Sequence, residues 1–354
     1  MLRKVNDRHD TVTQFTGREL RRGSRTLRAA SLLCGLCLLA RAALAAADAS
    51  PEPPRQAMSD AWWTGPLLAP NGSSFPAGHW LVEPYVFDVI TNGHFDANGT
   101  RQPGPREHDL GSLTYIIYSL TDRLALGVLP RIGYNEPAGQ PNSSSVGFGD
   151  LGVQLQYGLT DFHEGSWVPS TAVVVAETLP TGRYDRLAEP SDGSGSGVYT
   201  TAFSWYSQEY LWMPNGRILR ARLDLTYAVS GSAGVADQSV YGTAPGFRGH
   251  VYPGDSFTVD AAAEYSVTRS WVLATDLIWV HDSSTRLTGS APPVGGVAPP
   301  IDLQSGSSEY FAVAPAVEYS WSARAGVIFG VRIFLAGRNT SASITPAAAI
   351  NLVF

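Results

Sequence analysis

Apolar and polar side chains alternate strictly along much of the chain beyond residue 79. Segments 150–157, 219–229 and 257–267 each place apolar side chains at every second position, with charged or polar side chains between them. In the second segment, Leu219 opens the apolar set and Arg220 opens the polar set. A period of two is typical of β-strands, because successive side chains point to opposite faces of a sheet.

The alternation and the turn residues together predict about twelve strands. They run at roughly 79–90, 110–119, 123–134, 147–159, 167–179, 198–212, 217–230, 256–268, 271–282, 309–320, 324–335 and 343–354. The connections alternate between long ones, such as 91–109, 231–255 and 283–307, and short ones, such as 120–122, 213–216 and 321–323. We expect both ends of the chain on the side of the short turns.

A soluble sandwich and a membrane barrel give the same alternation, and the connection lengths favour the barrel. Transmembrane barrels join their strands by tight turns on one side and extended loops on the other. A sandwich has no reason to keep this asymmetry through six hairpins. The sequence therefore predicts an all-β protein, a transmembrane antiparallel up-and-down β-barrel of about 12 strands, formed by residues 79–354.

The two ends of the chain indicate the compartment. The last five residues, 350–354, resemble the terminal strand of bacterial outer-membrane barrels, in which the closing aromatic residue (here Phe354) is part of the assembly signal. Residues 1–47 combine a basic start, an apolar stretch and a small-x-small step, which predicts a signal peptide cleaved near Ala45 or Ala47. An uncleaved inner-membrane anchor is the alternative. We expect the cell outer membrane of a Gram-negative bacterium.

Cleavage would change both the charge and the cysteine content. Residues 1–47 hold nine Lys and Arg against three Asp and Glu, so the formal net charge falls from −6 to about −12. A strongly acidic chain is a poor binder of phosphate backbones, so we expect no nucleic-acid partner. Both cysteines, Cys34 and Cys37, lie in this segment, and a cysteine-based metal site is not expected in the mature chain. Residues 48–78, rich in Pro, Ala, Gly and Ser, are expected to be a periplasmic segment and a possible plug.

The polar face of the strands supplies the candidate functional residues. A charge exposed to hydrocarbon costs about 2–4 kcal/mol near the bilayer midplane, so these side chains should point into the barrel. The predicted lumen-lining set is Arg131, Asp150, Gln154, Gln156, Arg220, Arg222, Asp224, Asp260, Glu264, Glu318 and Arg332. These residues either pair into a salt-bridged filling or line a water-filled path, and the sequence leaves both open.

Tyrosines recur just before the short turns. Tyr118, Tyr157, Tyr210, Tyr265 and Tyr319 occupy corresponding places in five hairpins. Tyrosines gather at membrane–water interfaces, so this set predicts an aromatic girdle at the periplasmic headgroup level.

The sequence offers little for catalysis. Residues 147–152 match G-x-G-x-x-G, but an alternating strand follows instead of the helix that a nucleotide site needs. The histidines are scattered without metal-ligand spacing, although His281, Asp282 and Ser283 lie together near a predicted strand end. We expect no enzyme, no cofactor and no metal. A barrel enzyme of the lipase or protease type and a plugged structural or adhesive barrel remain the alternatives.

Three short stretches carry a family resemblance. Residues 80–85, 149–161 and 177–184 resemble the outer-membrane β-barrel channel family associated with meta-pathway phenol degradation. The Leu-Pro-Thr-Gly step at 179–182 is the most family-like part. The resemblance covers roughly residues 75–354 and implies a channel for passive or facilitated uptake of small, often aromatic, hydrophobic molecules. The expected partners are outer-membrane lipids, the outer-membrane assembly machinery and a small-molecule solute.

Overall fold

The computed structural model describes residues 54–292 and 298–354, and within them the chain is almost entirely strands. The predicted signal peptide and its cleavage site lie outside the described residues. Of the helices that the described residues form, none has the length and apolar character needed to cross a membrane.

The elements include two short 3-10 helices, η2 (Met58–Asp60) and η3 (Pro190–Asp192). The strands are β1 (Trp80–Phe95), β2 (Arg101–Ser119), β3 (Leu124–Leu129), β4 (Arg131–Glu136), β5 (Gly147–Phe148), β6 (Leu151–Thr160), β7 (Ser170–Leu179), β8 (Thr200–Trp212), β9 (Ile218–Ser230), β10 (Ala233–Ala236), β11 (Arg248–Tyr252), β12 (Ser256–Ser266), β13 (Trp271–Asp282), β14 (Arg286–Ser290), β15 (Pro300–Gln304), β16 (Ser308–Ser322), β17 (Ala325–Arg338) and β18 (Thr340–Val353).

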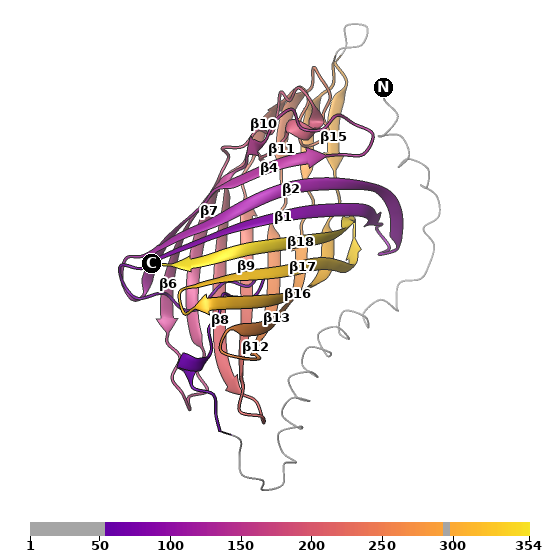
Figure 1. The fold of residues 1–354 in the computed structure, drawn as a ribbon. Helices are drawn as coiled ribbons and strands as arrows, with labels where there is room; N and C mark the ends of the chain where they lie inside the picture. Colours follow the sequence, from indigo (N-terminus) through magenta and orange to yellow (C-terminus); the bar gives the residue numbers. More distant parts are fainter. Residues whose placement is uncertain (1–53, 293–297) are drawn as a thin grey trace, which may run out of the picture. The chain divides into compact units, whose positions relative to one another are not determined.

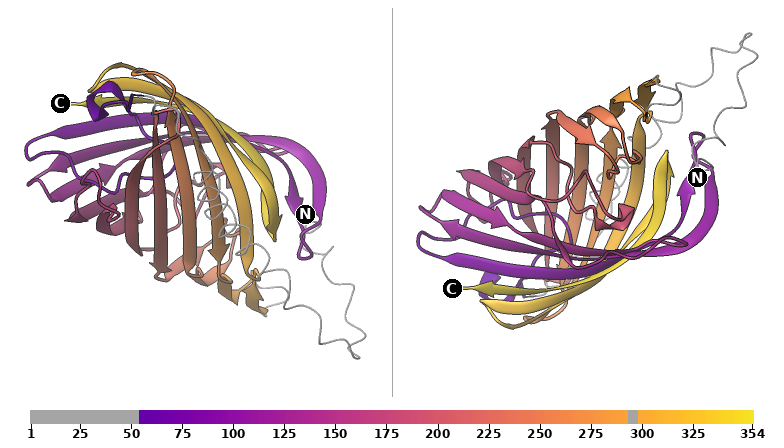
Figure 2. Two further views of the ribbon diagram at one scale, coloured as in Figure 1. Left: turned by 90° about the horizontal axis from the view of Figure 1, so that it is seen from below. Right: turned by 90° about the horizontal axis from the view of Figure 1, so that it is seen from above.

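The main sheet closes on itself. Neighbouring strands follow one another in chain order, and β1 pairs with both β2 and β18, so that Tyr85 lies opposite Leu113 on one side and Ala349 on the other. Two strands of the barrel are interrupted: β3 and β4 together make up one of them, and β5 and β6 together make up the next. If each interrupted strand is counted once, the result is a closed antiparallel barrel of twelve strands, which confirms the predicted fold class (Figures 1 and 2).

The last residue helps to close the barrel. The backbone N–H of Phe354 donates to the carbonyl of Trp80 at 2.9 Å, and the N–H of Trp80 donates back to Phe354 at 3.1 Å. The first and last strands are therefore joined to the very end of the chain. The role of Phe354 in assembly stays a prediction.

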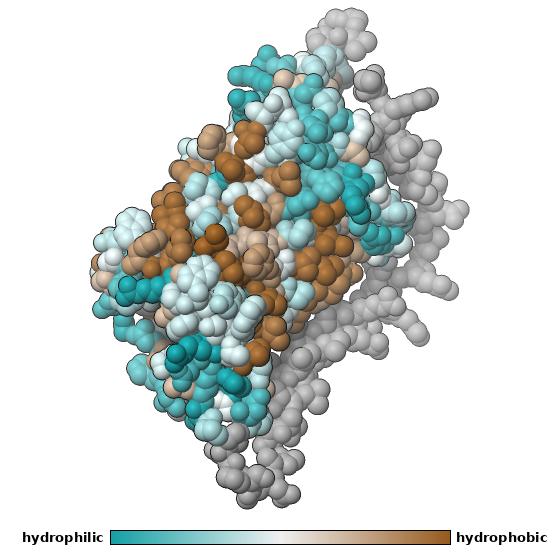
Figure 3. Space-filling model, viewed as in Figure 1, coloured by the Kyte–Doolittle hydropathy of each residue, from teal (hydrophilic) through white to brown (hydrophobic). Residues whose placement is uncertain are grey.

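Burial alternates along the strands and identifies the two faces of the wall. Phe203, Leu273 and Phe329 are more than half exposed, whereas their strand neighbours Ser204 and Val272 are buried. Exposed apolar side chains gather in the middle of the face seen in Figure 3, and hydrophilic residues lie toward both ends. This distribution is what a barrel needs to present its outer face to hydrocarbon.

Two of the predicted long connections contain regular structure. Segments 231–255 and 283–307 contribute a second, four-stranded sheet in the order β10-β11-β14-β15. Its core consists of six buried residues, Val198, Ala233, Val235, Phe247, Val251 and Leu287. The short strands of this sheet carry glycine and few β-branched residues, which is why the alternation in the sequence did not predict them.

The predicted long connection at 91–109 was wrong. β1 continues to Phe95 and β2 begins at Arg101, so a tight turn replaces the loop. Asp96 stabilises that turn, because its carboxylate accepts the backbone N–H groups of Asn98 at 2.8 Å and Thr100 at 3.0 Å. Thr91, Asn92 and Gly93 have turn-like composition, but a register shift accommodates them within the strand pair.

Candidate functional site

The segment after residue 53 reaches the inner face of the barrel wall, where two carboxylates bind its backbone. Asp276 on β13 accepts the N–H groups of Leu67 at 3.1 Å, Leu68 at 3.3 Å and Ala69 at 2.9 Å. Glu318 on β16 accepts the N–H groups of Thr64 at 2.6 Å and Gly65 at 3.1 Å. The backbone N–H groups of this segment, which have no strand partner, thereby find hydrogen-bond acceptors inside the barrel. We call residues 54–78 the inner segment.

The wall also donates to carbonyl groups of the inner segment. Arg222 Nη1 donates to the carbonyl of Ala69 at 2.7 Å, and Gln156 Nε2 donates to that of Asn71 at 3.1 Å. Because these donors and the two carboxylates come from β6, β9, β13 and β16, the inner segment is held from several sides of the barrel. Three of these residues, Gln156, Arg222 and Glu318, belong to the predicted lumen set, and Asp276 does not.

A charged cluster lies beside the inner segment. The register places Arg220 on β9 opposite Glu264 on β12. Glu264 accepts Arg220 Nε at 2.6 Å and lies 3.1 Å from Arg222 Nε, and all three side chains are buried. The guanidinium group of Arg220 also lies over the ring of Trp63, 4.6 Å from its centre. The charges therefore pair with one another here, as in the salt-bridged alternative for the lumen.

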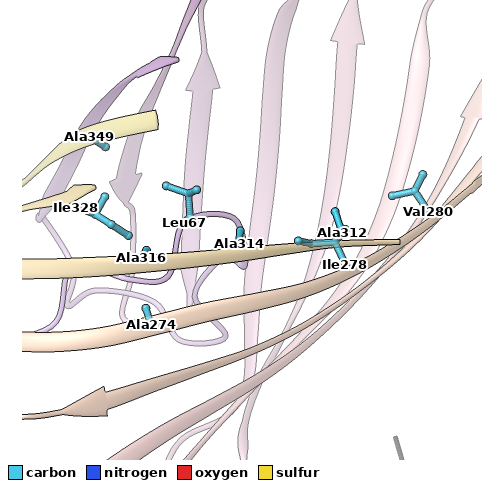
Figure 4. Packing of buried hydrophobic residues seen from close by; sticks show 9 residues of the cluster. All are labelled: Leu67, Ala274, Ile278, Val280, Ala312, Ala314, Ala316, Ile328 and Ala349. Atoms are coloured by element: carbon cyan, nitrogen blue, oxygen red, sulfur yellow. The ribbon is translucent and has the colours of Figure 1, made fainter. Parts of the chain in front are cut away.

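The inner face is not uniformly polar. Leu67 of the inner segment packs against a buried apolar cluster that includes Ala274, Ile278, Ala316 and Ile328 (Figure 4). Apolar side chains therefore share the inward face with the polar set predicted from the sequence. Apolar wall residues are buried where the inner segment covers them, because removing apolar surface of both the wall and the segment from water is favourable.

This mixed face explains why Asp276 was missed in the sequence. On β13 it shares the inward side with Val272, Ala274, Ile278 and Val280, all of them apolar and buried. Along residues 271–280, both faces of the strand are thus apolar apart from this carboxylate and Thr275. An isolated Asp in such a strand was the one signal that could have identified it.

Loop residues within 144–150 and 182–196 are joined by hydrogen bonds, and we call these two segments the roof. Asp150 accepts the N–H of Gly182 at 2.9 Å, the N–H of Ser196 at 2.7 Å and the hydroxyl of Ser196 at 2.8 Å. Asp192 accepts the N–H of Ser144 at 2.7 Å and its hydroxyl at 2.5 Å. These hydrogen bonds from Ser144 hold the pKa of Asp192 below its ordinary value, since they stabilise the carboxylate.

Between the inner segment and the roof lies a cavity of about 810 Å³. Leu67 and Leu68 of the inner segment form part of its lining. Its wall side carries Tyr85 and Phe87 from β1, Leu113 and Tyr115 from β2, and Ala347 from β18. Its volume falls within the range of roughly 300–1,000 Å³ usual for small-molecule sites. Its lining combines apolar and aromatic side chains with a comparable number of polar and charged ones.

The remaining members of the predicted lumen set lie at different places. Arg131 and Arg332 line the cavity, as does Asp150 of the roof. Asp224 and Asp260 lie directly opposite each other on β9 and β12, and both are buried. Gln154 on β6 lies beside Gly127 of β3, its paired neighbour. The structure thus distributes eight of the eleven predicted residues among the charged cluster, the inner-segment contacts and the cavity, and it places Gln154, Asp224 and Asp260 outside these three sites.

Four of the five tyrosines predicted to form a girdle lie on the outward face, and Tyr210 does not. Tyr118 lies opposite the exposed Trp80, and Tyr319 opposite the exposed Trp271; Tyr157 and Tyr265 also lie among outward-facing positions. On β8 the outward residue is Leu211, whereas Tyr210 contacts Trp63 of the inner segment edge to face at 6.2 Å. The prediction that Tyr210 belongs to the girdle was therefore wrong. Tyr210 and its neighbour Leu211 point to opposite faces of the sheet, and Leu211 is the residue on the outer face.

The triplet at 281–283 forms no catalytic arrangement among the described contacts. The ring of His281 stacks on Trp279, and Asp282 accepts the hydroxyl of Ser308 at 3.2 Å. No group of three or more His, Cys, Asp or Glu residues with metal-binding geometry occurs in 54–292 or 298–354.

The comparisons with known proteins agree with the resemblance in the sequence. The family model described as "Putative MetA-pathway of phenol degradation" matches residues 78–345. No curated protein sequence matches the chain.

Solved structures were also compared with this chain, and the first of those named here shares its fold. An outer membrane channel of Pseudomonas putida F1 is similar with a TM-score of 0.60 and 16% identity, covering 81% of this chain and 100% of that one. The β domain of the Bordetella autotransporter BrkA gives a TM-score of 0.39 at 10% identity, covering 79% and 100% of the two chains. The P. putida toluene transporter TodX gives 0.33 at 10% identity, covering 83% and 95%.

Proposed function

This chain belongs to the family described as "Putative MetA-pathway of phenol degradation", and from that premise we propose that it is an outer-membrane channel for small hydrophobic, including aromatic, molecules. The observation that carries the proposal is the cavity inside the closed barrel, which the aromatic side chains of Tyr85, Phe87 and Tyr115 line. The fold relative from Pseudomonas putida F1, itself an outer membrane channel, supports it. Passage follows the concentration gradient and needs no covalent step.

We further propose that the inner segment acts as a plug. It contributes Leu67 and Leu68 to the lining of the cavity, and five backbone N–H groups bind it to Asp276 and Glu318. A segment held by so many contacts closes the path for ions while leaving the cavity beneath the roof in place. The charged cluster then serves to anchor the plug, not to conduct ions.

Two adjacent residues of β18 give a matched test of the channel. Ala347 lines the cavity, whereas Ala348 follows it on the opposite face of the strand. We expect Ala347→Trp to fill the cavity and to lower the initial uptake of a radiolabelled aromatic compound, such as toluene, by Gram-negative cells that produce the protein. Ala348→Trp should transport like the wild type, because its ring points outward toward lipid.

Whole cells are the appropriate system, because toluene crosses plain phospholipid vesicles unaided whereas a lipopolysaccharide leaflet resists it. Heat-modifiability on gels establishes that both variants fold. Equal uptake by cells with wild type, Ala347→Trp or no channel would contradict the proposed function.

A further inference from the structure

Two arginines that line the cavity have no acidic partner within residues 54–292 and 298–354. Arg131 is the first residue of β4, and Arg332 lies on β17. Neither takes part in an ion pair among the described residues, which hold eight such pairs elsewhere. The Nε of Arg332 is buried without a hydrogen-bond partner in this part of the chain. Two cations therefore face the cavity with unused donors.

The acids that line the cavity do not neutralise these arginines. Asp150 and Asp192 are each occupied by hydrogen bonds from the roof loops. Asp109, the third, lies on β2 with Glu107, Asp88 and His108 as its charged neighbours. The cavity lining therefore holds both signs of charge, three aspartates and two arginines, but among the described residues none of the three forms an ion pair with Arg131 or Arg332.

Strand order places the aromatic side chains between the two arginines. Across the wall the sequence of strands is β4, β2, β1, β18 and β17, which lie side by side in Figure 1. Tyr115 belongs to β2, and Tyr85 and Phe87 belong to β1. The rings of Tyr85 and Tyr115 meet edge to face, with centres 6.0 Å apart. A further aromatic ring can join this arrangement with the same favourable geometry.

The register brings one arginine close to the aromatic rings. Arg131 lies opposite Leu113, and Leu113 lies opposite Tyr85, so the three residues share one level of the barrel. Tyr115 is two residues further along β2 and faces the same cavity. A ring held against Tyr85 and Tyr115 would therefore present a substituent to the guanidinium group of Arg131.

We propose that the cavity binds a monoaromatic carboxylate, with the ring against Tyr85 and Tyr115 and the carboxylate paired with Arg131, while Arg332 adds attraction from across the aromatic patch. The proposal rests on the proposed channel function and names its substrate class. A guanidinium group matches a carboxylate with two parallel hydrogen bonds. A neutral hydrocarbon contacts the same rings without pairing the arginines, so it should still pass through the cavity but bind there more weakly than the carboxylate.

Benzoate and benzamide give the sharpest pair of probes, because they share shape and differ in charge. Isothermal titration of the full-length folded barrel in detergent should show benzoate binding at least about tenfold more tightly than benzamide. We expect Arg131→Gln to remove this preference and Arg332→Gln to reduce it. Arg324→Gln, in the turn between β16 and β17, is the control with an unchanged preference.

Equal affinity of the wild type for benzoate and benzamide would overturn the proposal. So would an Arg131→Gln variant that folds, by heat-modifiability, and keeps the preference for benzoate. If toluene uptake still depends on an open cavity in the Ala347→Trp test while benzoate is not preferred, the substrate class fails and the channel function stands. If the Ala347→Trp substitution has no effect on uptake, the channel function itself fails.

Discussion

Glu264 provides the most demanding test of the barrel interior. Its carboxylate is fully enclosed, accepts Arg220 Nε at 2.6 Å and lies 3.1 Å from Arg222 Nε. Replacing Glu264 with Ala leaves two buried guanidinium groups without their shared counter-charge. Removing one partner of a buried ion pair costs about 3–5 kcal/mol, because the remaining charge is stranded in a medium that solvates it poorly.

The effect should be visible as a shift of the unfolding midpoint. With urea slopes of about 1–3 kcal/mol/M, a loss of this size lowers the midpoint by at least about 1 M. The assay is a urea titration of the chain folded into short-chain phosphocholine vesicles, followed by tryptophan fluorescence and gel mobility. Glu264→Gln keeps the volume of the side chain and isolates the effect of its charge.

A matched control lies outside the barrel wall. Arg286 and Asp302 on β14 and β15 form an equally direct pair, with Nη2 and Oδ2 2.7 Å apart, but both side chains are more than half exposed. Water replaces the lost partner there, so Asp302→Asn should leave the midpoint unchanged. If Glu264→Ala behaves like Asp302→Asn, the guanidinium groups of the charged cluster have other partners and the description of the interior is wrong.

Three further outcomes follow from named contacts. Hydrogen bonds from Ser144 lower the pKa of Asp192, so their contribution to loop stability is complete above the ordinary pKa of 3.8 and is lost as the pH falls through the lower folded value. The protection of the Ser144 amide against hydrogen exchange, taken relative to its intrinsic rate at each pH, should therefore fall in that range. In Asp192→Asn this pH-dependent loss of protection should be absent. Gly182→Ala should loosen the roof, measured as faster proteolysis of the loops, because an added Cβ would lie 2.8 Å from backbone atoms of Gly195; unchanged cleavage would argue against this close contact. Asp276→Ala removes the acceptor of three N–H groups and should raise single-channel conductance as the inner segment loosens, whereas Asp276→Asn, which keeps one acceptor oxygen, should conduct less than Asp276→Ala.

The strand pattern was predictable wherever one face met lipid and the other met polar groups. Segments 219–229 and 257–267 correspond closely to β9 (Ile218–Ser230) and β12 (Ser256–Ser266). Exposure to hydrocarbon on one face and ion pairing on the other produces a strong alternation. The family resemblance at 179–182 also has a physical basis, because Gly182 makes its close approach to Gly195 in the roof.

What the sequence did not predict depends on tertiary contacts. Alternation is lost on β13, because the inner segment covers its inward face and makes apolar residues favourable there. The four-stranded sheet of the long connections pairs short strands that are distant in the chain, and short strands carry little periodic signal. The cavity could not be predicted either, since Arg131 and Tyr85 face the same space only when β1, β2 and β4 are paired.

The inward and outward faces of β18 provide the most direct test of the whole account. Because both cysteines lie within residues 1–47, a chain that begins at residue 48 can carry a single nitroxide label at Ala347→Cys or Ala348→Cys. In lipid vesicles, we predict that the label at 348 collides with dissolved oxygen, which concentrates in the bilayer, and that the label at 347 does not. Equal oxygen accessibility at the two positions, or the reverse order, would contradict a barrel with its cavity inside and lipid outside.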